Sequence, residues 1–263
     1  MGILNVTPDS FSDGGRYADR SAALERALQM VEEGADIIDI GGESTRPGSL
    51  PVEPQAEMDR VLPVIEKLKS KTEALISVDT MKSAVAAAAL EAGAHIINDI
   101  SALGFDERMA ETARKYKAGL ILMQKKGAPQ TMQDNPQYKN ILLEVEQYLR
   151  RSIRRAAAAG IEPGTIAVDP GIGFGKTVEH NLRLIANTAR LKKLKKPVVI
   201  GLSRKSFLGK ITGRAVNERL AAGLGALAFC FLNGANIFRV HDVKEARDVF
   251  SVLNAILEEK QAC

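Results

Sequence analysis

The chain has 263 residues, of which 45% are hydrophobic and 26% charged, and its formal net charge is +4. The length suits one α/β domain of about 250 residues, and so small a charge does not indicate nucleic-acid binding, although it agrees with an anionic small substrate. Two cysteines, Cys230 and Cys263, are too few for a disulfide framework or a cysteine metal cluster. Because the chain has no apolar run of about 18 residues and no signal-like N-terminus, we expect no membrane partner and a reduced, cytoplasmic location.

Short β-branched runs alternate with longer helical patterns along the whole chain. The runs predict eight strands, at residues 2–6, 36–40, 74–78, 95–98, 120–123, 166–169, 198–202 and 236–240. Helical patterns follow them at about 20–33, 54–70, 81–92, 106–117, 137–159, 178–193, 215–233 and 243–259. The fifth helical pattern is the clearest, because Ile141, Val145 and Leu149 recur every four residues and Gly160 fits the C-terminal end. Eight strand–helix units predict one (β/α)8 TIM barrel over residues 1–263, with a doubly wound open sheet as the alternative.

A glycine-rich run, VDPGIGFGKT at residues 168–177, raises the question of a phosphate-binding loop. A P-loop would need glycine where Pro170 stands, and a Rossmann fingerprint would need glycine where Lys176 stands. Both nucleotide motifs therefore fail by one residue. What the run offers instead is a carboxylate, Asp169, at the end of an apolar strand and before a tight loop.

The ends of the predicted strands are unusually polar, and the active sites of TIM barrels lie at those ends. The polar segments are Asn5-Val6-Thr7-Pro8-Asp9, Asp39-Ile40-Gly41-Gly42-Glu43, Val78-Asp79-Thr80, Asn98-Asp99, Asp169-Pro170, Ser203-Arg204-Lys205-Ser206 and Arg239-Val240-His241-Asp242. Salt bridges and helix capping, for example by Asp79, Asp99 or Asp242, are the structural alternative for any one of them. The whole set favours a site for a flat heterocycle rich in N–H donors, with an anion beside it on Arg239 and His241.

Seven segments together resemble the dihydropteroate synthase family, in the family's order and at the expected strand ends. They are MGILNVTPDSFSDGG at residues 1–15, GGESTRPG at 41–48, SVDT at 77–80, IINDIS at 96–101, DPGIGFGK at 169–176, GLSRKSFLG at 201–209 and RVHD at 239–242. The resemblance covers essentially the whole chain. It implies a TIM barrel that condenses 6-hydroxymethyl-7,8-dihydropterin pyrophosphate with p-aminobenzoate, giving 7,8-dihydropteroate and pyrophosphate in folate synthesis.

The resemblance also implies a role for each residue of these segments. The pterin pocket would consist of Asp79, Asn98, Met123, Asp169, Phe174 and Lys205. The diphosphate would bind Asn5, Thr45, Arg46, Arg239 and His241, with Asn5 as a ligand of a Mg²⁺ cofactor. Phe11, Asp13 and Pro47 would lie in mobile loops over p-aminobenzoate, which Lys205 and Ser206 would contact. Asp79, Asp169, Lys205 and Arg239 would be the catalytic residues, and members of the family are generally homodimers.

The implied reaction depends on the placement of charge. Mg²⁺ and Arg239 would hold the charge of the departing diphosphate, and Asp79 or Asp169 would stabilise the cation left on the pterin. The aniline nitrogen of p-aminobenzoate would then attack, so the resemblance implies a dissociative substitution without a covalent enzyme intermediate.

Two features depart from the family pattern. Residues 123–124 are Met-Gln where the family commonly has Met-His, and no segment precedes the first strand to close the barrel floor. The second feature predicts either a lower stability or a trimmed start. Two other functions stay open: a methyltetrahydrofolate–corrinoid methyltransferase, which has no use for the TPDSFSDGG, STRPG and SRKSF segments, and a non-catalytic pterin-binding protein.

Overall fold

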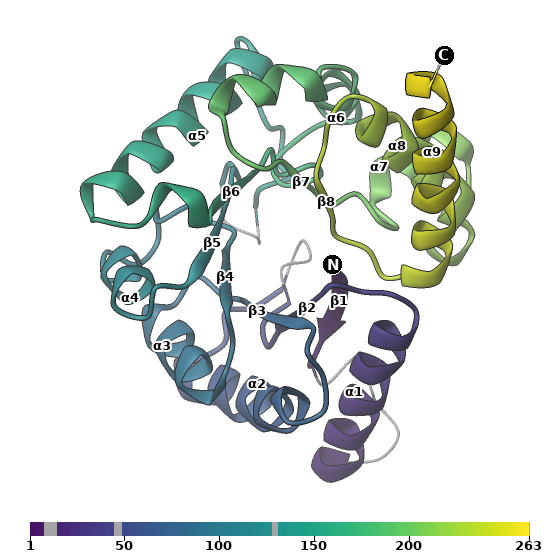
Figure 1. Ribbon diagram of the computed structural model, residues 1–263. Coiled ribbons are helices and arrows are strands. Elements are labelled where there is room, and N and C mark those ends of the chain that lie inside the picture. The colour runs from purple at the N-terminus through teal and green to yellow at the C-terminus, as the bar shows by residue number, and fades with distance from the viewer. Residues whose placement is uncertain (8–14, 45–48, 128–130, 263) are drawn as a thin grey trace.

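Parallel strands form a barrel at the centre of the molecule, and helices surround it as an outer ring (Figure 1). The computed structural model describes residues 1–7, 15–44, 49–127 and 131–262, and for residues 15–19, 261 and 262 it describes the backbone only. Six strands pair in sequence order: β1 (Gly2–Asn5), β2 (Ile37–Gly41), β3 (Leu75–Asp79), β4 (Ile96–Asp99), β5 (Gly119–Met123) and β6 (Ile166–Asp169).

Two short strands, β7 (Val199–Ile200) and β8 (Ile237–Phe238), complete the ring as a separate parallel pair. A bridge between Val168 and Val198 joins this pair to β6, and a bridge between Val240 and Gly2 joins it to β1. The sheet is therefore closed on itself. This closure confirms the predicted TIM barrel and excludes the open doubly wound sheet.

The helices alternate with the strands, as the sequence predicts. They are α1 (Gly15–Glu32), α2 (Pro54–Lys69), α3 (Ser83–Ala92), α4 (Met109–Lys115), α5 (Ile141–Ala158), α6 (Val178–Ala186), α7 (Ser206–Thr212), α8 (Leu220–Leu232) and α9 (Val243–Ala262). The described residues also form the 3-10 helices η2 (Pro163–Thr165), η3 (Thr188–Leu194) and η4 (Val216–Glu218). Within the described ranges, none of the helices combines the length and the apolar character needed to cross a membrane.

Helix α5 shows how local sequence sets an element. Its apolar positions, Ile141, Val145 and Leu149, are buried against the core, as their spacing predicts. The side chain of Asn140 accepts a hydrogen bond from Leu143 N and caps the first turn. Gly160 follows the helix at φ +81°, the left-handed conformation that the prediction of a terminal glycine requires.

The structure differs from the sequence prediction at the sixth and seventh units. The predicted helix 178–193 ends at Ala186 and continues as η3, where the hydroxyl of Thr188 bonds to the carbonyl of Ile185 at 2.8 Å and competes with helix propagation. Helix α7 was not predicted. Its sequence, SFLGKIT, contains a glycine and two β-branched residues, so its intrinsic helix propensity is low.

The core has two parts, one between strands and helices and one inside the barrel. The inner part consists of Met1, Ile37, Ile121, Ala167 and Val199, which fill the barrel below its mouth. These apolar side chains fill the interior, and the polar residues predicted for the site lie beyond them, at the carboxyl ends of the strands.

Candidate active site

The carboxyl ends of β3 to β6 bring predicted pterin-binding residues into one wall of the barrel mouth. In the parallel register, Asp79 lies beside Gly41 and Asn98, and Met123 lies beside Asp169. Laterally paired residues of a sheet point to the same face. Asp79 and Asn98 therefore share a face, and so do Met123 and Asp169.

Arg239 reaches the same wall from the end of β8. Its Nε donates to Asp39 Oδ2 at 2.6 Å, and its Nη2 donates to Asp79 Oδ2 at 2.7 Å. Asn98 Nδ2 donates to the same oxygen of Asp39 at 3.0 Å. One fully buried carboxylate, that of Asp39, thus holds both the arginine and the amide of the predicted site.

Asp39 is the residue of this site to which the sequence reasoning gave no role. The available signal was a carboxylate inside β2, whose sequence IIDIG is otherwise apolar and buried. Its Oδ1, like Ser77 Oγ beside it on β3, is buried without a hydrogen-bond partner among the described residues. Such an unsatisfied oxygen destabilises the fold, so stability alone does not account for an acid at this position.

Burial shifts the pKa of several groups at the mouth. It raises the pKa of Asp79 to about 7, against the opposing effect of Arg239. It also raises the pKa of Asp169, which the charge of Lys205 counteracts, and it lowers the pKa of Lys205 to about 8. Ionisable groups whose pKa values are shifted by burial and by one another in one place are typical of a functional site.

The glycine-rich loop after β6 fixes Asp169. The backbone N–H of Gly171 donates to Asp169 Oδ1 at 2.6 Å, and Gly171 has φ +67°. A Cβ on Gly171 would collide with the carbonyl oxygen of Gln124. Only glycine therefore allows the loop to pass so close to the end of β5.

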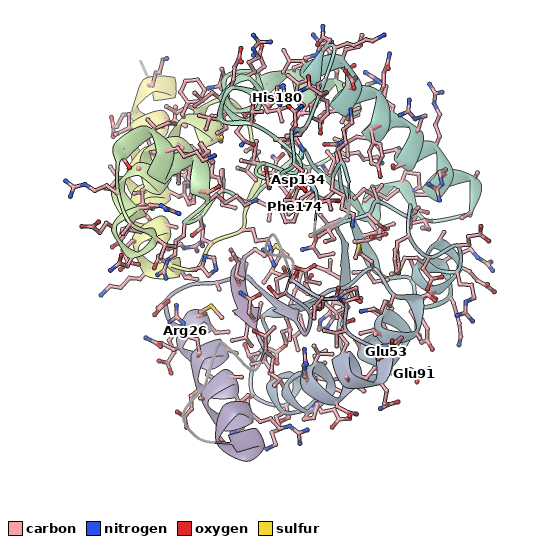
Figure 2. The ribbon with its side chains drawn as sticks, turned by 180° about the vertical axis from the view of Figure 1, so that it is seen from behind. Arg26, Glu53, Glu91, Asp134, Phe174 and His180 are labelled. Carbon is pink, nitrogen blue, oxygen red and sulfur yellow. The ribbon has the colours of Figure 1, made fainter. Side chains whose placement is uncertain are left out.

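Lys205 lies between this loop and the end of β7. Its Nζ is 4.6 Å from the centre of the Phe174 ring, a cation–π distance, and Figure 2 shows Phe174 inside the ring of helices. At Gly201, a Cβ would lie 3.6 Å from Arg239 Cβ and 3.9 Å from Asp169 Oδ2. Arg239 and Asp169 therefore both lie close to Gly201.

Three of the predicted diphosphate residues, Asn5, Arg239 and His241, lie on the β1 and β8 side of the mouth. Asn5 Oδ1 and Asp79 Oδ2 are both 3.8 Å from the point where a Cβ on Gly41 would lie. His241 Nδ1 is 3.1 Å from Ser203 Oγ at the rim. Asn5 thus faces the mouth beside an acid of the predicted pterin pocket.

The remaining predicted residues either lie at the exposed edge of the site or fall outside the described ranges. Ser206 begins α7 and is exposed. Five predicted residues lie outside the described ranges: Phe11, Asp13, Thr45, Arg46 and Pro47.

Within the described ranges, no group of three or more His, Cys, Asp or Glu side chains could hold a metal ion. Asn5 offers one oxygen, which fits Mg²⁺ because this ion keeps waters and binds largely through substrate phosphates.

Two acids at the strand ends serve local structure. Asp99 accepts the N–H of Ser101 at 2.8 Å and that of Leu103 at 2.6 Å, and so holds the turn after β4. Asp242 forms an ion pair with Arg204. The structural alternative considered for the strand-end acids is therefore correct for Asp242, through its salt bridge, whereas Asp99 stabilises a turn and neither caps a helix nor forms a salt bridge among the described residues.

A second buried charge cluster supports the connection between β2 and α2. Lys82 Nζ forms ion pairs with Glu43 and Glu57. Glu43 Oε2 also accepts the N–H of Val52 at 3.4 Å. The cluster therefore holds residues on both sides of positions 45–48.

Comparison with known proteins identifies the family. The family model described as "Pterin binding enzyme" matches residues 1–241. Dihydropteroate synthase of Escherichia coli (strain K12) is 42% identical over 261 residues, which cover 99% of this chain and 92% of that protein. The chain belongs to the dihydropteroate synthase family.

Solved dihydropteroate synthases have the same fold. The Xanthomonas albilineans enzyme with 4-aminobenzoic acid superimposes with a TM-score of 0.93 at 42% identity, covering 98% of this chain and 92% of that one. The same enzyme in complex with 7,8-dihydropteroate gives a TM-score of 0.89 at 40% identity, with 98% and 92% coverage. The resemblance predicted from seven segments is confirmed, and the chain is a transferase of folate synthesis.

One departure from the dihydropteroate synthase pattern, Gln124, lies next to the site. Its side chain is buried, and its Oε1 accepts a hydrogen bond from Lys176 Nζ at 2.6 Å. The residue is therefore part of the packing between the ends of β5 and β6.

Proposed function

We propose that the chain condenses 6-hydroxymethyl-7,8-dihydropterin pyrophosphate with p-aminobenzoate, releasing pyrophosphate and forming 7,8-dihydropteroate. The observation that carries the proposal is the gathering of Asp79, Asn98, Asp169, Lys205 and Arg239 in one barrel mouth. Relatives solved with 4-aminobenzoic acid and with 7,8-dihydropteroate support the choice of substrates.

The pocket would bind the pterin through acceptors aimed at its amino and ring N–H groups. Asn98 donates its Nδ2 to Asp39, which leaves its Oδ1 as an acceptor. Asp169 is oriented through Oδ1 by Gly171 and presents Oδ2. Each hydrogen bond to a charged group contributes about 1.5–3 kcal/mol net. These acceptors explain why a pterin, rather than an acidic heterocycle, suits the pocket.

The first chemical step would break the bond between the exocyclic CH₂ of the pterin and the diphosphate oxygen, which keeps both electrons. Arg239 binds carboxylates through Nε and Nη2, and its Nη1 is the remaining terminal nitrogen for a phosphate oxygen. When bound, Mg²⁺ would neutralise charge on the phosphate oxygens, with Asn5 as its protein ligand. Arg239 and Asn5 thus belong to the departure of the leaving group.

The positive charge left on the pterin would be stabilised by the carboxylates of Asp79 and Asp169. The amine nitrogen of p-aminobenzoate then forms the new C–N bond. Because alkylation makes this nitrogen acidic, its proton can pass to water, and no dedicated base is required. The reaction is accordingly a dissociative substitution driven by the placement of charge.

The test is an assay in which each component is omitted in turn. Sustained release of pyrophosphate, with formation of dihydropteroate, is expected only when the pterin diphosphate, p-aminobenzoate and Mg²⁺ are all supplied. Binding of the pterin without turnover under these conditions would instead establish a non-catalytic pterin-binding protein. Turnover that is independent of p-aminobenzoate would contradict the proposed condensation.

We further propose that the protein is a cytoplasmic homodimer that associates through α8 and α9. These neighbouring helices expose Phe229, Leu232, Val252 and Ile256, with exposed fractions of 45–60%, and apolar groups clustered on a surface favour association. Cys230 is a buried free thiol, as in a reduced compartment. Light scattering is expected to give the mass of two 28.4 kDa chains, and Val252→Glu is expected to give one. A monomeric native protein would refute the dimer, and cell fractionation tests the location.

A further inference from the structure

Lys176 is a charged residue that is almost fully buried, with 3% of its surface exposed. Lysine is rarely buried to this extent unless its ammonium group is compensated. In the part of the chain that the structure describes, no carboxylate lies within ion-pair distance of its Nζ. Burial lowers the pKa of Lys176, an effect that the charge of Asp169 opposes, and the compensation at the nitrogen itself comes from neutral acceptors.

Three oxygens supply that compensation. Lys176 Nζ donates to Gln124 Oε1 at 2.6 Å, to the carbonyl of Phe174 at 3.0 Å and to the carbonyl of Gln124 at 3.3 Å. An ammonium group has three N–H donors, so this arrangement uses all of them. Two of the acceptors belong to the residue after β5 and one to the loop after β6, and the lysine joins these segments.

Each of the two joined segments carries residues of the predicted pterin pocket. Met123 immediately precedes Gln124, and Gln124 N bonds to the carbonyl of Asp169 at 2.9 Å. The loop presents Phe174, whose own carbonyl is one of the acceptors of Lys176. A shift of the lysine would therefore move both Phe174 and the backbone beside Asp169.

Close packing makes the seam between the two segments sensitive to such a shift. A Cβ on Gly171 would collide with the carbonyl of Gln124, and one on Gly175 would collide with the carbonyl of Lys126. The point of the Gly171 Cβ is also 3.3 Å from Lys176 Nζ. The nitrogen thus sits inside the seam, in close contact with both backbones.

We propose that Lys176 is a positioning residue for the pterin pocket, acting through Gln124 and the carbonyl of Phe174. The inference rests on the proposed function of that pocket. Lys176 itself does not touch the substrate. Its effect is to fix the spacing between the ends of β5 and β6, and hence the width of the slot that receives the pterin ring.

The proposal predicts a selective effect on one substrate. Lys176→Met keeps the aliphatic stem and removes the three hydrogen bonds, so the KM for the pterin diphosphate is expected to rise at least about tenfold, the loss expected for a hydrogen bond to a charged group. The KM for p-aminobenzoate at saturating pterin is expected to change less than about twofold, because the second substrate would bind outside this slot. Calorimetry with 6-hydroxymethyl-7,8-dihydropterin is expected to show the same loss of affinity.

Lys126→Met is the matched control. Lys126 lies two residues after Gln124, donates to the backbone carbonyl of Gln137 and is largely exposed. Its replacement removes a lysine from the neighbouring segment after β5 and is expected to leave both KM values unchanged. A comparable rise of the pterin KM in this control would overturn the proposal, since general electrostatics would then explain the effect.

A double-mutant cycle with Gln124→Met keeps the idea testable if Lys176→Met folds poorly. Gln124→Met removes one acceptor only, and its effect on the pterin KM is expected to be non-additive with that of Lys176→Met. Additive effects, or equal losses for both substrates, would reduce Lys176 to a purely structural residue. If the unmodified protein fails to form dihydropteroate but binds the pterin, the proposed function falls while the binding test of Lys176 stays valid.

Discussion

Replacement of Asp39 by asparagine tests the central charge arrangement of the site. The variant keeps the shape of the side chain and removes the charge that holds Arg239 Nε at 2.6 Å and Asn98 Nδ2 at 3.0 Å. A hydrogen bond between charged groups contributes about 1.5–3 kcal/mol. If this is lost in the transition state, kcat/KM falls roughly 10- to 100-fold, at about 1.4 kcal/mol for each factor of ten.

The same variant has a second consequence that distinguishes it from a loss of folding. The charge of Asp39 raises the pKa of Asp79, although burial is the larger cause of its value of about 7. Activity that needs ionised Asp79 falls as the pH drops through this value. Without the neighbouring charge the pKa of Asp79 decreases, so the acidic limb of the kcat/KM profile is expected to move to lower pH, by on the order of one unit.

The measurement is a pH profile of kcat/KM for the pterin diphosphate, with thermal unfolding in parallel. Asp36→Asn is the matched control, because Asp36 is an exposed acid just before β2 whose ion pair with Arg247 spans 3.6 Å. This control is expected to leave the profile unchanged. An acidic limb that stays in place in Asp39→Asn, or that moves to higher pH, would refute the reasoning about this carboxylate.

Three further changes test the neighbouring parts of the site. Asp169→Asn is expected to abolish turnover with little change in melting temperature, because the amide oxygen can still accept the N–H of Gly171; an active variant would remove Asp169 from its role. Gln124→His is expected to be kinetically mild, since an imidazole nitrogen can accept the hydrogen bond of Lys176, and a large gain in rate would show that the native residue impairs the site. Gly171→Ala is expected to lose pterin affinity and to destabilise the protein by at least about 1–3 kcal/mol, whereas Gly164→Ala, at an open position, is expected to do neither when both are compared by calorimetry and denaturation.

Much of the fold follows from local sequence, and its departures have local causes. The strand–helix alternation and the apolar spacing of α5 predict the barrel, because each element repeats its own period. Helix α7 escapes prediction because its seven residues are too few and too poor in helix formers to leave a periodic signal. Strands β7 and β8 are shorter than the predicted runs 198–202 and 236–240, because only two residues of each strand pair in register.

The sequence predicts those residues of the site that stand at the ends of strands. Asp79, Asn98 and Asp169 stand at such ends, and the barrel rule places them together. Asp39 lies two residues before the end of β2 and therefore deeper in the barrel. Its role depends on Arg239, which reaches it from a strand far away in sequence. The burial of Lys176 also depends on a contact between loops, which spacing along the chain does not reveal.

The way in which the barrel closes has a consequence for the local fluctuations of the protein. Lys205 and Arg239 follow β7 and β8, the pair tied to the rest of the wall by isolated bridges at Val198 and Val240. Amide hydrogen exchange is therefore expected to begin at the two bridges that join β7 and β8 to the rest of the sheet, at a lower free energy than global unfolding requires. Fluctuations there would displace Lys205 and Arg239 while Asp39 and Asp79, on the continuous six-stranded part of the wall, stay in place, so the leaving-group side of the cavity would loosen first.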